Sequence, residues 1–164
     1  MKEILQQYAA YNCWSNQRMS DFIQPLEMGL LEKEIPSSFS SIHSTLLHMW
    51  DAESIWWQRM KLQEVITSPS ANFKGNAKDV VAALLHQNKL WESWVNNATE
   101  SAINHVFHYR NSKKEQFKQP VYQVLLHVFN HATYHRGQLV NMFRQVGLDK
   151  IPGTDFILWS RAKK

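Results

Sequence analysis

Three histidines on one predicted helix are the residues of this sequence best suited to chemistry. The chain contains eight histidines, and His127, His131 and His135 recur at intervals of four residues. Because each step rotates a helix position by about 40°, the three side chains fall within an arc of about 80°. Val124 and Val128 share this arc, so it is expected to face the core. Imidazole is the commonest side-chain ligand of metal ions, and the spacing indicates a candidate metal site.

Helix geometry limits which of these histidines can bind one ion together. Positions eight residues apart are separated by about 12 Å along the axis, too far for one ion held at about 2.1 Å. Either His127 with His131 or His131 with His135 can chelate, and the spacing leaves both pairs open. His131 belongs to both pairs.

A third ligand is expected from the second predicted helix, which carries His43 and His48. These positions are about 140° apart around the helix, so only one of them can point inward. His48 lies between Thr45 and Ala52 on the side with small residues, which leaves space for an ion, whereas His43 points elsewhere. The simpler alternative is that each histidine is buried alone and hydrogen-bonded to a carbonyl group. The histidines expected outside the site are His86, His105 and His108.

The hydrophobic pattern predicts the elements that must hold these histidines. Apolar residues recur every three or four positions over four long segments, which is typical of amphipathic helices. Asn76 with Asp79 predicts a capping box, and Gly147 predicts a C-terminal cap. The predicted helices run over about Lys2–Leu26, Ser41–Gln63, Asn76–Asn104 and Pro120–Gly147, followed by a short helix over Phe156–Arg161.

A short β-hairpin is predicted before the last long helix. Val106–Tyr109 and Glu115–Phe117 flank Asn111-Ser112-Lys113, a turn-forming segment. Four helices of this length, one of them followed by a long connection, predict an all-α fold, a four-helix bundle with a long crossover connection.

Composition is typical of a globular protein, which we predict to be a single domain over residues 1–164. Hydrophobic residues make up 44% and charged residues 20% of the chain, which argues against disorder. Five glycines and five prolines are too few for a sandwich of many short strands joined by turns.

Cysteine content, hydropathy and charge exclude several classes of protein. The only cysteine, Cys13, cannot form an intramolecular disulfide, which favours a reducing compartment. No apolar run approaches the ~20 residues that span a bilayer, so we expect a soluble, cytoplasmic protein without membrane contact. The net charge of +4 is spread along the chain and serves solubility, so a nucleic-acid partner is not expected.

Several segments resemble the DinB family of small helical-bundle proteins. The family signature His-x-x-x-His-Arg-Gly-Gln stands here at His131–Gln138. Tyr11–Asn16 resembles the family's first helix, Ser41–His48 with Glu53 and Trp56-Trp57 resembles its second, and Pro152–Phe156 fits its ending. The likeness covers nearly the whole chain, and the fourth-helix signature is its most specific part.

This resemblance implies a metal centre and a mode of assembly. In that family one histidine of the second helix and two of the fourth hold a divalent metal ion, which implies His48, His131 and His135 here. The resemblance thus selects one of the two pairs that spacing left open. It also implies a homodimer and a long crossover between the second and third helices.

Three imidazole ligands leave a coordination position open, as in catalytic metal sites. Imidazole suits zinc, nickel and iron alike, so the identity of the divalent metal ion stays open. Relatives of this bundle include metal-dependent thiol transferases, which implies activation of a low-molecular-weight thiol or of water. We therefore expect a metal-dependent enzyme acting on a small-molecule substrate, as a thiol-cofactor S-transferase or a hydrolase. The alternative is a non-catalytic metal-binding or stress-response module that acts through a protein partner.

The other residues of the signature are expected to support the site. Arg136 is predicted to pair with an acid, either Glu53 or Asp51. Gly137 is predicted to allow close approach of a neighbouring helix or side chain. The residues expected to lie beside the ligands, and to orient a histidine, a ligand or a water, are His127, Tyr134 and Gln138.

Overall fold

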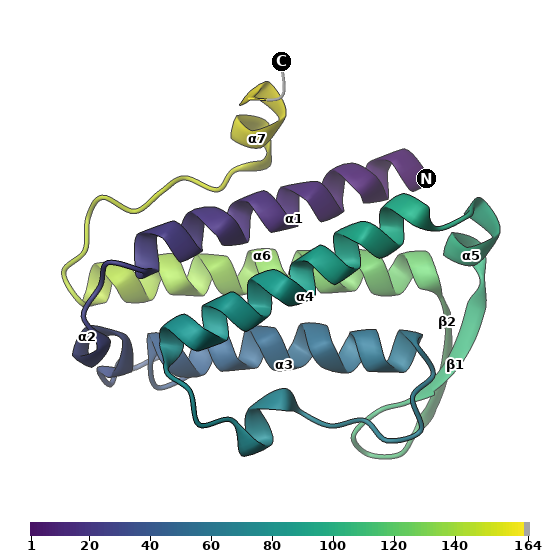
Figure 1. Cartoon of the computed structure of the whole chain (residues 1–164), viewed down its shortest axis with the longest axis horizontal. Coiled ribbons are helices and arrows are strands. Elements are labelled where there is room, and N and C mark those ends of the chain that lie inside the picture. The colour runs from purple at the N-terminus through teal and green to yellow at the C-terminus, as the bar shows by residue number, and fades with distance from the viewer. Residues whose placement is uncertain (163–164) are drawn as a thin grey trace.

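The amphipathic segments form four long helices, which carry three short helices and a hairpin (Figure 1). This computed structural model describes residues 1–162. The elements are α1 (Lys2–Ile23), α2 (Met28–Glu32), α3 (Ile42–Met60), the 3-10 helix η1 (Pro69–Asn72), α4 (Ala77–Asn97), α5 (Glu100–Asn104), β1 (Val106–Arg110), β2 (Gln116–Pro120), α6 (Val121–Gln145) and α7 (Phe156–Ala162). The prediction of an all-α four-helix bundle is confirmed.

The direction of the helices explains the long connection in the middle of the chain. Helices α3 and α4 run in the same direction, whereas α1 and α6 run in the opposite one (Figure 1). Helices α1 and α3 each pack against both α4 and α6. Because α3 and α4 are parallel, the chain must return along the whole bundle between them, which it does over residues 61–76 through η1. The predicted crossover lies at this place.

Side-chain caps fix where α3 and α4 begin. The Ser41 hydroxyl accepts a hydrogen bond from the Ser44 backbone N–H at 3.0 Å, and the Ser41 N–H donates to the Ser44 hydroxyl at 2.9 Å. Asn76 and Asp79 form the predicted capping box at the start of α4. These reciprocal bonds satisfy backbone donors that the first helical turn leaves free, and so they fix the register of both helices.

Several predicted boundaries differ from the structure by one to a few residues. Helix α1 ends at Ile23 instead of about Leu26, and α3 ends at Met60 instead of about Gln63. Helix α4 ends at Asn97 because Ala98 adopts an extended conformation, and Thr99 caps a separate helix by accepting from the Ala102 N–H at 3.1 Å. Threonine favours this N-cap position over a helix interior. Pro120 ends β2 and is the N-cap residue of α6.

The predicted hairpin is confirmed and slightly longer than the pattern indicated. Strand β1 pairs antiparallel with β2, with Val106 opposite Pro120 and Arg110 opposite Gln116. The Asn111 side chain closes the turn by accepting from the backbone N–H groups of Lys113 and Glu115. The hairpin therefore presents fixed side chains to the end of α3, with which β1 is in contact.

The core consists of two buried apolar clusters with a polar layer between them. One cluster is built around Ile23, Ile42 and Leu139, and the other around Leu5, Trp91 and Leu125. Between them the long helices bury polar side chains, among them Asn12, Asn16, Glu53, Asn88 and Arg136. Among residues 1–162, no helix is both long and apolar enough to cross a membrane.

Candidate metal centre

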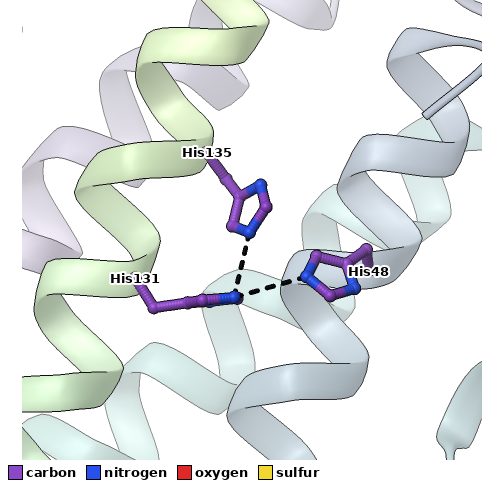
Figure 2. A group of neighbouring side chains, drawn as sticks. All are labelled: His48, His131 and His135. Carbon is purple, nitrogen blue, oxygen red and sulfur yellow. Dashed lines mark hydrogen bonds between the residues drawn. The ribbon is translucent and has the colours of Figure 1, made fainter. Parts of the chain in front are cut away.

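Three imidazole rings from α3 and α6 converge on one point (Figure 2). The Nε2 atom of His131 lies 3.3 Å from Nε2 of His48 and 2.9 Å from Nε2 of His135. The candidate ligand atoms of the three residues all lie within 4.8 Å of one another. We call His48, His131 and His135 the histidine cluster.

The helix spacing explains this convergence. His131 and His135 are one turn apart on α6, and the register of α3 turns His48 toward them (Figure 2). His127 lies one turn before His131, with ring centroids 5.7 Å apart, and its ring packs edge-on against Trp56 at 5.3 Å. Spacing left two pairs of histidines open. The structure places His131 and His135 together with His48, whereas His127 is next to the cluster and not part of it.

Hydrogen bonds among the three rings cannot satisfy all three converging nitrogens. A neutral imidazole nitrogen either donates one proton or accepts through one lone pair. Nε2 of His131 faces two other ring nitrogens at short distance, so a hydrogen bond can satisfy it toward only one of them. A cation between the rings would use all three lone pairs together.

The electrostatic surroundings keep these rings neutral. Burial, reinforced by the neighbouring histidines His135, His48 and His127, lowers the pKa of His131 from 6.5 to about 4. Burial also lowers the pKa values of His48 and His135. Neutral imidazole is the form that binds metal, so the cluster is ready to act as a ligand set near pH 7.

Gln138 fixes the orientation of one ring. Its Oε1 atom lies 2.7 Å from Nδ1 of His135 and accepts the proton there, which leaves the lone pair of Nε2 for the centre of the cluster. The amide nitrogen of Gln138 donates in turn to the Tyr134 hydroxyl at 3.2 Å and to the Ser38 hydroxyl at 3.4 Å. Metal-binding histidines are commonly held by such a second hydrogen bond.

Phe39 covers the cluster from the segment that precedes α3. Its ring stacks on His48 with centroids 4.4 Å apart, and it lies 5.8 Å from the ring of His135. This contact contributes to the burial that lowers the pKa values of the two histidines. Phe39 was not predicted from the sequence, because no helical periodicity links it to the cluster.

The geometry fits a divalent ion. Ligand nitrogens of a tetrahedral site with bonds of about 2.0–2.1 Å lie about 3.3 Å apart, and ligands at right angles lie about 2.9 Å apart. Two of the three separations, 3.3 and 2.9 Å, match these values, and the third is within 4.8 Å. His48, His131 and His135 could therefore hold a metal ion with little movement of their side chains.

Arg136 enters the bundle interior on the side away from the cluster. Its Nη1 atom donates to the side-chain oxygens of Asn12 at 2.6 Å and Asn16 at 3.0 Å. The Nδ2 atoms of Asn12 and Asn88 donate to the two Glu53 carboxylate oxygens, at 3.3 and 2.6 Å. We call Asn12, Asn16, Glu53, Asn88 and Arg136 the asparagine network.

The predicted pairing of Arg136 with an acid needs correction. Arg136 reaches Glu53 only through asparagine side chains, either Asn12 or Asn16 followed by Asn88. Asp51 instead accepts from the Ser70 hydroxyl at 2.5 Å on the crossover. Among residues 1–162 the one ion pair within 4 Å joins Lys89 to Glu92. Asparagine side chains separate the two buried charges because each can donate and accept at once.

The predicted role of Gly137 is wrong. A Cβ atom at this position would meet nothing within 4 Å, so no neighbouring element approaches the glycine closely. The remaining histidines lie where the sequence placed them, outside the cluster, and the structure groups none of them with it: His43, His86, His105 and His108.

Comparisons with known proteins agree on one family. A sequence model of the DinB family matches residues 1–163. The chain is 27% identical over 154 residues to Protein DinB of Bacillus subtilis (strain 168), a match that covers 91% of this chain and 89% of that protein. A DinB-like protein from Bacillus cereus ATCC 10987, with a crystal structure at 2.01 Å resolution, has a similar fold. Its TM-score is 0.71 at 21% sequence identity, over 92% of this chain and 95% of that chain.

Proposed function

The chain belongs to the DinB family, and from this premise we propose that it is a metal-dependent enzyme acting on a small-molecule substrate. In this proposal His48, His131 and His135 hold a divalent ion, which is zinc, nickel or iron. The reaction is either transfer of a low-molecular-weight thiol, as by a thiol-cofactor S-transferase, or hydrolysis. The observation that supports it best is the convergence of three neutral ring nitrogens, which have no sufficient set of hydrogen bonds among themselves.

The ligand count supports catalysis over a structural role for the ion. Structural zinc sites usually close with four protein ligands, whereas three protein ligands leave a position for water or substrate. A divalent ion in the cluster would supply Lewis acidity, which lowers the pKa of a thiol or of water placed at that position. Among residues 1–162, no further histidine, cysteine, aspartate or glutamate joins the three histidines as a fourth candidate ligand.

Side chains around the cluster have distinct tasks in this proposal. Gln138 holds His135 in the tautomer whose Nε2 lone pair faces the centre. Phe39 excludes water from the rings of His48 and His135. Tyr134 is 62% exposed, and its hydroxyl accepts from Gln138, so its own proton stays available to a substrate at the mouth of the site.

Metal content tests the site directly. We expect about one divalent ion per chain in the wild-type protein by elemental mass spectrometry, and loss of that ion in His131→Ala. The matched control is His127→Ala, which removes a neighbouring histidine of the same helix and should keep the ion. A protein that stays metal-free after incubation with zinc, nickel and iron contradicts the proposal. Loss of metal in both variants would instead favour the pair His127 and His131.

Activity tests the enzymatic part. The metal-loaded protein is screened with low-molecular-weight thiols against electrophilic acceptors, and with hydrolysable esters and amides. Turnover that disappears in His131→Ala and survives in His127→Ala supports the proposal. Stoichiometric metal binding without turnover in either screen would point to the non-catalytic module that acts through a protein partner.

The proposal includes a homodimer in the cytoplasm. The apolar side chains of Ile4 and Leu126 are 62% and 37% exposed and line the same shallow depression beside α1 and α6, which suits a contact with a second copy. Leu126→Lys should halve the mass measured by light scattering if this surface is the interface. The single cysteine Cys13 is buried and free, as expected in a reducing compartment.

A further inference from the structure

A second polar recess lies at the end of α3, where the hairpin meets the helix. It is a cleft of about 350 Å³ between the segment that follows α3 and strands β1 and β2. Its polar lining includes Arg59, His108 and Arg110, together with the amides of Gln63 and Gln116. Glu64 is the only acidic residue among those that line the cleft, so its side chains carry a net positive charge.

Arg59 packs against aromatic rings and has no polar partner in the described part of the chain. Its guanidinium carbon lies 4.7 Å from the ring centroid of Trp56 and 5.7 Å from that of Tyr109. Its Nε atom is buried and has no hydrogen-bond partner among residues 1–162. The Nε atom of the buried Arg136 also lacks a partner within this range, but its Nη atoms donate hydrogen bonds to Asn12, Asn16 and Thr133. The Nη atoms of Arg59 have no hydrogen-bond partner among the described residues and are not buried, so they can donate to an anion that enters the cleft.

The lining of the cleft also contains an unusual leucine. Leu62 follows the last turn of α3 with φ of 52°, and the Gln63 N–H returns to the Gln58 carbonyl at 3.0 Å. Helices that end in this way favour glycine at the residue with positive φ, because a side chain there is strained. The 65% exposed Leu62 side chain lines the cleft beside Ile66. The cleft thus offers apolar side chains as well as cationic ones.

The cleft and the histidine cluster lie along one face of α3. Arg59 follows His48 by 11 residues, which puts it about 20° from His48 around the helix and about 16 Å along the axis. Ring contacts join the two regions: His131 packs on His127, His127 on Trp56, and Trp56 on Tyr109, with centroids 5.0–5.7 Å apart. Besides burial, the charge of Arg59 helps to lower the pKa of His127.

We propose that the Arg59 cleft binds the anionic group of an extended substrate whose reacting end lies at the histidine cluster. The anion is a carboxylate or a phosphate group, and the adjoining part of the molecule is apolar enough to contact Leu62 and Ile66. The position of the reacting end rests on the proposed function. Binding of an anion at Arg59 does not, because no residue that lines the cleft belongs to the cluster.

Nuclear magnetic resonance of the metal-free protein tests the subsite. The probes are succinate and inorganic phosphate, with neutral succinamide as the control, and the readout is the Nε–Hε signal of Arg59. We expect a saturable shift of this signal with at least one anion and none with succinamide. Succinate alone would identify a carboxylate, and phosphate alone a phosphoryl group. No shift with either anion overturns the proposal.

Variants show whether the contact is specific. Arg18 is a matched control, because its guanidinium also lies over a tryptophan, Trp14, at 5.1 Å, but its Nε donates to the Gly153 carbonyl outside the cleft. Arg59→Gln should weaken anion binding about tenfold or more, as measured at the backbone amides of Leu62 and Arg110. Arg18→Gln should leave binding within twofold of the wild type. Equal weakening in both variants would show a general effect of charge and overturn the proposal.

The two proposals can fail separately. Repeating the succinate titration with and without one equivalent of zinc measures the two sites in the same sample. Binding of succinate at Arg59 without binding of metal would support the anion subsite and refute the metal-dependent function. A chain that binds zinc at the histidines but no anion at Arg59 keeps the metal centre and refutes the extended anionic substrate.

Discussion

His135 and Arg136 are consecutive residues of α6, yet their side chains enter two different kinds of polar surroundings. Arg136 is 1% exposed, and the oxygens of Asn12, Asn16 and Thr133 accept hydrogen bonds from its guanidinium. His135 faces two other ring nitrogens and lies beside the exposed Tyr134. The asparagine network binds the four long helices to one another, whereas the histidine cluster joins only α3 and α6.

The difference lies in whether the chain completes its own polar interactions. In the network, neutral amides carry the interaction between a buried cation and a buried carboxylate, so both charges are compensated inside the protein. In the cluster, three ring nitrogens converge, and no cationic group of residues 1–162 bonds to them. A network whose two charges compensate each other acts on stability, whereas ring nitrogens that lack a full set of hydrogen bonds have capacity left for a ligand.

Removing the cation of the network should have the largest effect. Arg136→Met leaves Glu53 buried without its compensating charge, which we expect to lower the free energy of unfolding by about 3–5 kcal/mol. Urea unfolding followed by circular dichroism measures this change. The control Arg144→Met, at an exposed position of the same helix, should cost less than about 1 kcal/mol. Similar costs for the two variants would mean that the network does not stabilise the bundle.

The two regions should also respond to pH in opposite directions. Burial raises the pKa of Glu53 from 4.5 to about 7, although the hydrogen bonds from Asn12 and Asn88 oppose this shift. The folded state then binds more protons than the unfolded state between these values, so this carboxyl group costs stability as the pH rises through that range. For His131, with its pKa lowered to about 4, the unfolded state binds more protons, and stability rises up to about pH 6.5.

Glu53→Gln isolates the contribution of the network. The unfolding free energy of the variant relative to the wild type should increase by about 2–3 kcal/mol from pH 5 to pH 8, because the variant has no carboxyl group to ionise. Urea titrations of both proteins at the two pH values give this difference. If the difference in unfolding free energy between the two proteins is the same at both pH values, Glu53 titrates as an exposed carboxyl group does.

Metal should stabilise the protein only through the cluster. At free zinc 100-fold above the dissociation constant, the wild-type protein should gain about 2.7 kcal/mol of unfolding free energy, and His131→Ala should gain none. Without metal, His131→Ala should cost about 1 kcal/mol or less, because the half-buried ring lacks a full set of hydrogen bonds. Thermal unfolding with and without zinc checks both values. A large loss of unfolding free energy in His131→Ala without metal would show that His131 itself stabilises the fold.

Local patterns account for the parts of the molecule that the sequence predicts well. The capping box at Asn76 and Asp79, the hairpin before α6 and the four-residue spacing of His131 and His135 each depend on residues close together in the chain. The third histidine, His48, required the family resemblance as well as the small-residue face of its helix. Boundaries were less accurate, since Thr99 interrupts a helical pattern with a cap of its own.

The asparagine network could not be predicted in the same way. Asn12 and Asn16 are one turn apart on α1, which signals a polar stripe but does not say what meets it. Their partners come from α3, α4 and α6, up to 124 residues away, and depend on how the helices pack. The sequence therefore suggested a direct pair between Arg136 and Glu53 or Asp51, because charge alone is visible in the sequence and the intervening amides are not.

The smallest effect should come from removing the hydrogen bond between Gln138 and His135. Gln138→Ala removes the acceptor of His135 Nδ1, so the ring loses its fixed tautomer, and we expect zinc affinity to fall about tenfold, or about 1.4 kcal/mol. Gln138→Glu keeps an acceptor and should retain affinity, whereas Gln123→Ala, exposed on the same helix, should change nothing. Competition with a zinc chelator measures all three. Equal affinity in Gln138→Ala and wild type would show that His48 and His131 orient the third ring without help, and that the cluster is held by helix geometry alone.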